Sequence, residues 1–173
     1  MSFMKKKRNN HKKKNIMEEL KLDSKIMFCQ MDELDDKDRI LVETAMAATD
    51  NSYSPYSKFK VGAAIRLDDG TIIKGANQEN AAFSITICAE RSAIYAAQAQ
   101  HPEKAIVSIA IAARNEEGFT KEPVSPCGMC RQAMVEIEQR YSQPIHILLY
   151  GRKGVYVMDS ISNLMPLSFV DLN

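Results

Sequence analysis

The sequence lacks any uninterrupted apolar stretch of the roughly 18 residues that a membrane-spanning helix requires. Its basic N-terminus is also not followed by the apolar segment and small-residue cleavage site of a secretory signal. The first absence argues against a membrane protein, and the second favours a cytoplasmic location.

Cysteine is also scarce, with four residues in a chain of 173. Four unevenly spaced cysteines are too few for the disulfide framework of a small secreted protein, and in a reducing compartment such a set indicates metal ligands. Cys88, Cys127 and Cys130 lie in two short motifs, whereas Cys29 is far from them in the sequence.

The composition excludes a fibrous or wholly disordered chain, because 45% of the residues are hydrophobic and 26% are charged. A chain of this length fits one domain with a core of its own, and it shows no convincing internal repeat. We therefore expect a single globular domain.

The net charge of +1 conceals an uneven distribution of charged residues. Residues 1–14 carry seven of the 23 Lys and Arg residues and no acid, which leaves 16 basic against 22 acidic residues in the rest of the chain. Such an acidic body does not suit a surface that binds a polyphosphate, so no nucleic-acid partner is expected.

Three segments are expected along the chain. Residues 1–16 are predicted to be a disordered basic tail, residues 17–34 an N-terminal extension without an assigned role, and residues 35–173 the functional domain. Two alternatives for the tail are a mis-assigned leader, with Met17 as the natural start, and a nucleic-acid-binding arm.

Hydrophobic periodicity predicts alternating helices and strands. An amphipathic helix is expected over residues 35–50, and the Asp68-Asp69-Gly70 turn is expected to join strands 61–67 and 71–76 in a hairpin. The remaining expected elements are helices 88–100 and 127–141, strands 105–113, 145–150 and 155–158, a polar loop over 114–126, a short strand around 26–30 and a short helical end near 163–166. This order predicts an α/β fold in which helices sandwich a mixed sheet.

Two motifs carry the chemistry, Cys88-Ala89-Glu90 and Pro126-Cys127-Gly128-Met129-Cys130. Residues three apart share one face of a helix, so Cys127 and Cys130 can bind the same metal ion from a first helical turn. A right-handed crossover between the two predicted helices brings both helix starts to the same end of the sheet. There the helix dipoles favour thiolates, and the three sulfurs are expected to converge on one zinc ion.

Three protein ligands leave the fourth tetrahedral position open to water, which is typical of catalytic zinc. Zinc lowers the pKa of bound water from about 15.7 to about 7 at favourable sites. Glu90 can act on that water only if Cys88 lies at the very start of its helix and the Glu90 side chain folds over the open coordination position. Arg91, and as second choice Arg131, are expected to donate to the sulfurs and offset their negative charge.

Two alternatives to an open zinc site remain at this point. In one, the zinc site is closed and purely structural, with Cys29, His101 or His146 as the fourth ligand. In the other, the three cysteines are small buried hydrophobic residues.

The chain resembles the homotetrameric zinc-dependent cytidine deaminases over roughly residues 35–170, and its two motifs match the all-cysteine signature of zinc nucleobase deaminases. The order and spacing of four segments carry this resemblance. They are SPYSKFKVGAA (54–64), GANQENAAFSITICAERSAI (75–94), PVSPCGMCRQ (123–132) and LMPLSF (164–169).

The resemblance implies a three-layer α/β/α sandwich with a five-stranded mixed sheet. It also implies hydrolytic deamination of cytidine and deoxycytidine to uridine and deoxyuridine plus ammonia, in pyrimidine salvage, with one Zn²⁺ per chain. By the same resemblance, the chains assemble into a homotetramer.

The resemblance further implies roles for individual residues. Phe59 lies against the pyrimidine ring, Asn77 and Glu79 hold the ribose 3′-hydroxyl, and backbone groups of Ala89 and the 125–126 segment bind the base and the leaving amine. Tyr56 and Phe169 are implied to reach the active site of a neighbouring subunit. Phe83 is a departure, since relatives often have tyrosine there.

The expected mechanism follows from these assignments. Zinc-bound water loses a proton to Glu90, the resulting hydroxide attacks C4 of cytosine, and Glu90 returns the proton to N3 and later assists the departure of ammonia. A carboxylate at Glu79 would repel a 3′-phosphate, so a free nucleoside is the expected substrate.

Three rival functions share parts of this pattern. A deaminase of another aminopyrimidine, such as a nucleoside antibiotic, would use the same zinc site. A polynucleotide deaminase would explain the basic tail. A protein with a purely structural zinc ion would explain the cysteines alone.

Overall fold

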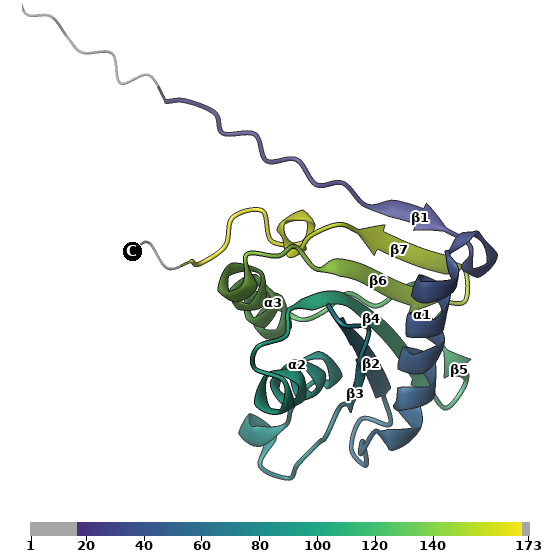
Figure 1. The fold of residues 1–173 in the computed structure, drawn as a ribbon. Helices are drawn as coiled ribbons and strands as arrows, with labels where there is room; N and C mark the ends of the chain where they lie inside the picture. The colour runs from purple at the N-terminus through teal and green to yellow at the C-terminus, as the bar shows by residue number, and fades with distance from the viewer. Residues whose placement is uncertain (1–16, 171–173) are drawn as a thin grey trace, which may run out of the picture.

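The computed structural model describes residues 17–170, in which helices flank a mixed β-sheet (Figure 1). The strands are β1 (Met27–Cys29), β2 (Lys60–Leu67), β3 (Ile72–Ala76), β4 (Ile106–Asn115), β5 (Gly118–Phe119), β6 (His146–Gly151) and β7 (Gly154–Met158). The α-helices are α1 (Asp36–Ala48), α2 (Ala89–Gln100) and α3 (Gly128–Tyr141). The short 3₁₀ helices are η1 (Met31–Glu33), η2 (Thr49–Asn51), η3 (Phe83–Ile85) and η4 (Ile161–Asn163). The predicted disordered tail, residues 1–16, lies outside the described residues.

The sheet has the strand order β1-β7-β6-β4-β2-β3, with β5 paired to β4. The β4–β6 pairing is parallel and the β2–β4 and β6–β7 pairings are antiparallel, so the predicted mixed sheet is confirmed. The expectation of five strands is wrong, because the sheet of residues 17–170 has seven. One additional strand, β1, comes from the N-terminal extension, and the other, β5, forms a short hairpin with β4 where a loop was expected.

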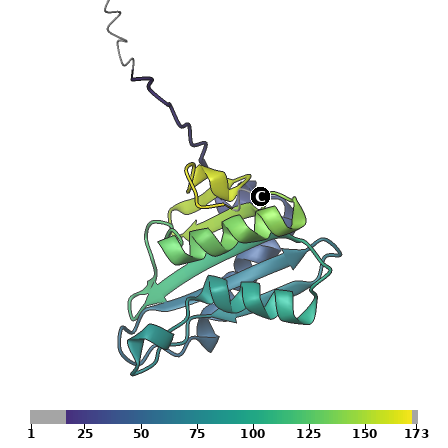
Figure 2. The same ribbon diagram turned by 90° about the vertical axis from the view of Figure 1, so that its left-hand side faces the viewer.

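Two apolar cores lie on opposite faces of the sheet, because side chains alternate along each strand. In β2, Ala63 and Ile65 face the core formed with α2 and α3, whereas Ala64 faces the core formed with α1. Figure 1 shows α1 on one side of the sheet, and Figure 2 shows α2 and α3 lying next to each other on the other side. Within residues 17–170, no helix is both long and apolar enough to span a membrane.

Gly75 in β3 allows the first turn of α2 to pack directly on the sheet. A Cβ atom at this position would lie 2.5 Å from both the Ala89 carbonyl oxygen and the Ala93 nitrogen. These are backbone atoms, which cannot rotate away as a flexible side chain would. Any larger residue at position 75 would therefore displace the start of α2, and with it Cys88 and Glu90.

The N-terminal extension covers the edge of the sheet beside β7. Its strand β1 pairs with β7, the Phe28 and Tyr156 rings pack edge to face at 5.6 Å, and the Lys25 nitrogen donates to Asn163 Oδ1 over 2.7 Å. Gly154 makes room for the strand, since a Cβ there would lie 2.6 Å from a Phe28 ring carbon. The extension thus protects a sheet edge that would otherwise offer unpaired backbone groups.

An ion-pair cluster anchors the start of α1 to the sheet. Asp38 Oδ2 lies 2.8 Å from His146 Nε2, and Asp38 Oδ1 lies 3.5 Å from an Arg66 guanidinium nitrogen. Asp159 lies 3.6 Å from the other ring nitrogen of His146. The hydrogen bond with Asp38 raises the pKa of His146 above its ordinary value of 6.5, and the same bond lowers the pKa of Asp38 below 3.8.

This cluster predicts how stability depends on pH. The His146 contribution is fully present below about pH 6.5 and is lost as the pH rises through the raised pKa of the folded state. The Asp38 contribution is present above about pH 3.8 and is lost as the pH falls through its lowered pKa. Replacement of His146 by Asn should therefore remove about 1 kcal/mol of unfolding free energy near pH 5.5 and much less above pH 8.

Urea denaturation at a series of pH values measures this difference. His101→Asn is the matched control, because His101 caps the C-terminal end of α2 and makes none of these contacts. Parallel pH profiles for the wild-type protein and His146→Asn would contradict the assignment.

Candidate metal centre

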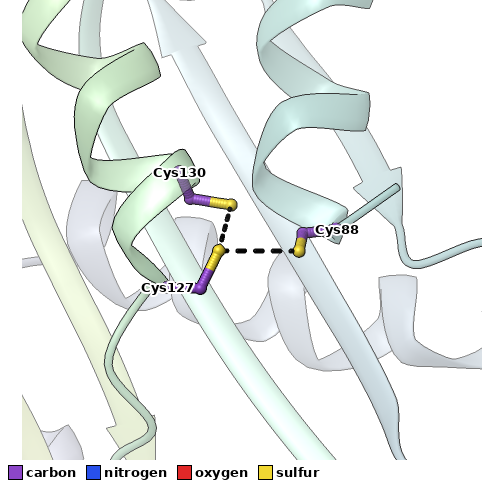
Figure 3. Close-up of side chains that lie close together, drawn as sticks. All are labelled: Cys88, Cys127 and Cys130. Carbon is purple, nitrogen blue, oxygen red and sulfur yellow. Dashed lines mark hydrogen bonds between the residues drawn. The ribbon is translucent and has the colours of Figure 1, made fainter. Parts of the chain in front are cut away.

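Cys88, Cys127 and Cys130 meet where two helices begin (Figure 3). Cys88 is the N-cap residue of α2, with φ −73° and ψ 155°, and Cys127 is the N-cap residue of α3, with φ −66° and ψ 165°. Cys130 lies in the first turn of α3. The positive ends of both helix dipoles therefore face the three sulfurs and favour their charged form.

The sulfur separations fit a tetrahedral zinc ion. Zn–S bonds of about 2.3 Å at tetrahedral angles place sulfurs roughly 3.8 Å apart. The Cys88–Cys127 separation is 3.8 Å, the Cys127–Cys130 separation is 3.4 Å, and all three sulfurs lie within 4.8 Å of one another. This donor set can hold zinc with little rearrangement, so the three thiols suit the metal in both spacing and chemistry.

The three residues considered as a fourth ligand lie elsewhere. Cys29 pairs with Val155 at the edge of the sheet, and His146 bonds Asp38. His101 caps the opposite end of α2, about 18 Å along the axis of a helix of 12 residues. Among residues 17–170, the cysteine triad is the one group of three or more ligand-type side chains close enough to share an ion.

The cysteines are not simply small core residues. Cys127 is exposed and Cys88 is half-buried, and only Cys130 is buried. Hydrogen bonds from Cys130 and Arg91 lower the pKa of Cys88 to about 5, so Cys88 is a thiolate at neutral pH. The contact with that thiolate, reinforced by burial, raises the pKa of Cys130. A cation among the sulfurs would supply the charge compensation that this arrangement lacks.

The two arginines that follow the motifs have different positions. An Arg91 guanidinium nitrogen lies 3.8 Å from Cys88 Sγ, as the sequence predicts. The expectation that Arg131 also donates to the sulfurs is wrong. Its guanidinium instead bonds the Pro126 carbonyl oxygen, Ser125 Oγ and the Leu164 carbonyl oxygen, each over 2.9 Å.

Arg131 therefore holds the loop that precedes Cys127 against the C-terminal segment. Next to it, the Gln132 side chain donates to the Phe169 carbonyl oxygen over 2.9 Å. Sequence reasoning missed this pair of clamps because their partners are backbone carbonyl groups, which no residue type reveals.

Glu90 is the second residue of α2 and is 5% exposed. It follows Cys88 by two positions, and Cys88 is the N-cap of α2, so the first of the two conditions for Glu90 to act beside the cysteines is met. Burial raises the pKa of Glu90, and the negative charge of Cys88 adds to this effect. Ala89, between them, is fully buried at 0% exposure.

Phe59 and Asn77 are linked by a hydrogen bond where β2 begins and β3 has just ended. Asn77 Nδ2 donates to the Phe59 carbonyl oxygen over 2.9 Å, and Asn77 Oδ1 accepts from the Val61 nitrogen over 2.8 Å and from Ser52 Oγ over 2.6 Å. Both Phe59 and Asn77 are half-buried. The amide side chain therefore fixes the loop that carries Phe59.

Glu79 lies two residues beyond Asn77, in the segment that follows β3. Its Oε2 atom accepts from the backbone nitrogens of Tyr56, at 2.9 Å, and Ser57, at 3.2 Å. Hydrogen bonds with Ser57 and Tyr56 lower the pKa of Glu79, so the carboxylate is ionised at neutral pH. The backbone contribution from residues 56 and 57 was another feature that the sequence did not reveal.

Several aromatic side chains are unusually exposed. Tyr56 is 52% exposed and packs edge to face with Phe83, which is 74% exposed, at 5.9 Å between ring centroids. Phe169 is 82% exposed. Tyrosine and phenylalanine are enriched in protein interfaces relative to the rest of the protein surface.

Comparison with known proteins gives a consistent result. Residues 35–142 match the family model described as the cytidine and deoxycytidylate deaminase zinc-binding region. The chain is 38% identical over 137 residues to a cytidine deaminase of Halalkalibacterium halodurans, an alignment that covers 78% of this chain and 97% of that protein.

Two further relatives bear on structure and substrate. A crystal structure of cytidine deaminase from Burkholderia pseudomallei superposes with a TM-score of 0.64 at 37% identity, covering 75% of this chain and 97% of that one. A blasticidin-S deaminase of Bacillus cereus is 33% identical over 135 residues, covering 77% of this chain and 92% of that protein.

The geometry predicts that zinc binding depends on the triad and not on the fourth cysteine. Replacing Cys88 by Ser should lower zinc affinity by more than about tenfold, since loss of even an outer partner of a metal ligand has an effect of that size. Zinc content per chain, measured by atomic emission after dialysis against a weak chelator, tests this. Cys29→Ser is the matched control, and equal zinc loss in both variants would contradict the site.

Proposed function

The chain belongs to the cytidine and deoxycytidylate deaminase family, and we propose that it hydrolyses cytidine and deoxycytidine to uridine and deoxyuridine with release of ammonia. The observation that carries the proposal is the triad of cysteine sulfurs at two helix starts with the buried Glu90 two residues from Cys88. A closed structural site would have no use for a buried acid at that position. We further propose that the enzyme works in pyrimidine salvage in the cytoplasm.

The metal in this proposal is one Zn²⁺ per chain, held by Cys88, Cys127 and Cys130. When bound, zinc supplies a water molecule whose pKa is low enough to provide a nucleophile at neutral pH. Arg91 bonds the Cys88 sulfur and offsets part of its negative charge. Without that compensation, three thiolates would make the bound zinc ion a weak Lewis acid.

Glu90 carries the proton transfers. It takes a proton from the attacking water, delivers it to N3 of the pyrimidine and assists the departure of the 4-amino group as ammonia. Its buried position favours this role, because a carboxyl group with a raised pKa exchanges protons near neutral pH more readily than an exposed one. Backbone groups of Ala89 and of the segment that Arg131 holds, residues 125–126, would orient the base.

The nucleoside part of the substrate is assigned to three residues. Phe59 would lie against the ring, and Asn77 and Glu79 would bind the 3′-hydroxyl. The ionised Glu79 favours a free hydroxyl, because it would repel a phosphate at that position. The acidic body of the chain adds to the case against a polynucleotide substrate.

A second candidate function is deamination of a nucleoside antibiotic. The identity with a blasticidin-S deaminase, which extends over most of both chains, favours it. In this candidate the zinc ligands and Glu90 have the same roles, and only the part of the substrate that lies beside Asn77 and Glu79 differs.

The proposed assembly is the homotetramer of the family, with each chain a three-layer α/β/α sandwich. Exposed aromatic side chains support self-association, in particular Tyr56 and Phe169, which would contribute to the site of a neighbouring subunit. The Tyr56–Phe83 contact would then lie at a subunit boundary.

Replacement of Glu90 by Gln should separate metal binding from catalysis. The amide has nearly the same shape but cannot take up the proton, so kcat for cytidine should fall by at least about 10²-fold while zinc content and Tm stay close to those of the wild-type protein. Turnover is followed by the loss of cytidine absorbance. Undiminished turnover in Glu90→Gln would rule out the assigned role.

A substrate panel should separate the two candidate functions. Ammonia release from cytidine, deoxycytidine, cytosine, deoxycytidine monophosphate and blasticidin S is compared at equal enzyme concentration. We expect the two nucleosides to give the highest kcat/KM and free cytosine to be poor, since it lacks the sugar that Asn77 and Glu79 would bind. A clear preference for blasticidin S would favour the second candidate, and a preference for the nucleotide would contradict the reading of Glu79.

A further inference from the structure

The Asn77 side-chain amide already makes three hydrogen bonds within the protein. An amide oxygen has two lone pairs, and those of Oδ1 are both used, by the Val61 nitrogen at 2.8 Å and by Ser52 Oγ at 2.6 Å. One Nδ2 hydrogen bonds the Phe59 carbonyl oxygen. Among the residues that the structure describes, this leaves Asn77 with one donor to offer and no acceptor.

Backbone groups fix which way the amide points. If it were flipped, Nδ2 would face the Val61 N–H group and Oδ1 would face the Phe59 carbonyl oxygen, so both contacts would become repulsive. Val61 and Phe59 therefore set the orientation by themselves. The contact with Ser52 must contribute something else, namely occupation of the second lone pair of Oδ1.

Ser52 is held beside Asn77 by a short backbone ladder. The Tyr53 nitrogen donates to the Asn77 carbonyl oxygen over 3.0 Å, and the Glu79 nitrogen donates to the Tyr53 carbonyl oxygen over 2.8 Å. Ser54 Oγ lies 3.3 Å from Ser52 Oγ, and since Ser52 has a single hydroxyl proton, which the shorter contact with Asn77 uses, Ser54 supplies the proton of this second bond. The hydroxyls thus form a chain that points toward the Asn77 oxygen.

Glu79 has the opposite character. An ionised carboxylate accepts but cannot donate, and the Tyr56 and Ser57 nitrogens occupy two of its roughly four lone-pair positions. A group that binds both side chains must then accept from Asn77 and donate to Glu79 at the same time. A hydroxyl does both with one oxygen, whereas a fluorine, an ether or a phosphate dianion cannot donate.

We propose that Ser52 is a specificity-determining positioning residue, which makes Asn77 a pure donor and so restricts the sugar position to a free hydroxyl. This inference rests on the proposed function, since it concerns the same nucleoside site. Ser52 acts through Asn77 and touches no reacting atom. Without its hydroxyl, Oδ1 regains an acceptor position, and the remaining N–H group becomes a weaker donor because the hydrogen-bond chain behind it is shortened.

The test compares cytidine with 3′-deoxycytidine in Ser52→Ala. For cytidine, KM should rise about three- to tenfold with kcat nearly unchanged, which is the range expected for one neutral hydrogen bond that acts on binding. For 3′-deoxycytidine, which has no hydroxyl at that position, KM should change less than about twofold. The ratio of kcat/KM between the two substrates should therefore fall in the variant.

Two further variants make the test independent of folding. Ser52→Thr keeps the hydroxyl and should retain the wild-type ratio, while Ser52→Cys, with a weaker donor, should lower it to an intermediate value. Ser162→Ala, at an exposed serine of η4, is the matched control and should leave the ratio unchanged. Tm is measured for each variant.

The possible results separate the inference from the function on which it rests. Equal losses on both substrates, or a fall in kcat alone, would show that Ser52 is merely structural and would overturn the inference while cytidine turnover by the wild-type protein stands. Failure of the wild-type protein to turn over cytidine would overturn the proposed function itself, and the inference with it. A lowered ratio in Ser52→Thr would also count against the inference.

Discussion

The geometry of this site depends on two helices that begin at the same end of one sheet. Cys88 and Cys127 are the N-cap residues of α2 and α3, so the chain enters both helices beside a single point, and Cys130 adds a third sulfur from the first turn. The strands that precede the two helices, β3 and β4, produce this arrangement: each is antiparallel to β2, so both end at the same edge of the sheet, where α2 and α3 begin. Close packing then holds it, since Gly75 admits the start of α2 to within contact distance of the sheet backbone.

Charge is balanced over the same small region. A thiolate, two more sulfurs and a buried carboxyl group meet at the positive ends of two helix dipoles, with the Arg91 guanidinium beside them. Such a concentration of acidic groups is costly without a cation, and a zinc ion among the sulfurs would offset it. The same cation would thus compensate both the sulfurs and the buried carboxyl group. A buried acid beside the metal ligands favours a catalytic zinc site over a purely structural one.

The helices and most strands could be predicted from hydrophobic periodicity. In α2, α3 and the β2–β3 hairpin, apolar residues recur at the intervals that place them on the buried face of the helix or strand. The short strand expected around residues 26–30 is present as β1, but its partner strand, and the whole of β5, show where that reasoning ends. The segment 27–29 is too short for periodicity to reveal its pairing with β7, and the β5 hairpin is two residues of a polar loop. Likewise the partners of Arg131 and Gln132 are backbone carbonyl groups, which become neighbours only after the chain has folded.

The sequence alone predicted the candidate metal ligands and the acid two residues from Cys88, because local helical geometry places the cysteines on one face and thiolates are ligands that zinc prefers. It also indicated Phe59, Asn77 and Glu79 through family resemblance. The tertiary structure alone decided that Cys29, His101 and His146 lie away from the triad, that Arg131 clamps a loop and that Ser52 occupies the second lone pair of Asn77. Those features depend on contacts between segments distant in sequence, and such contacts exist only once two apolar cores have packed against the sheet.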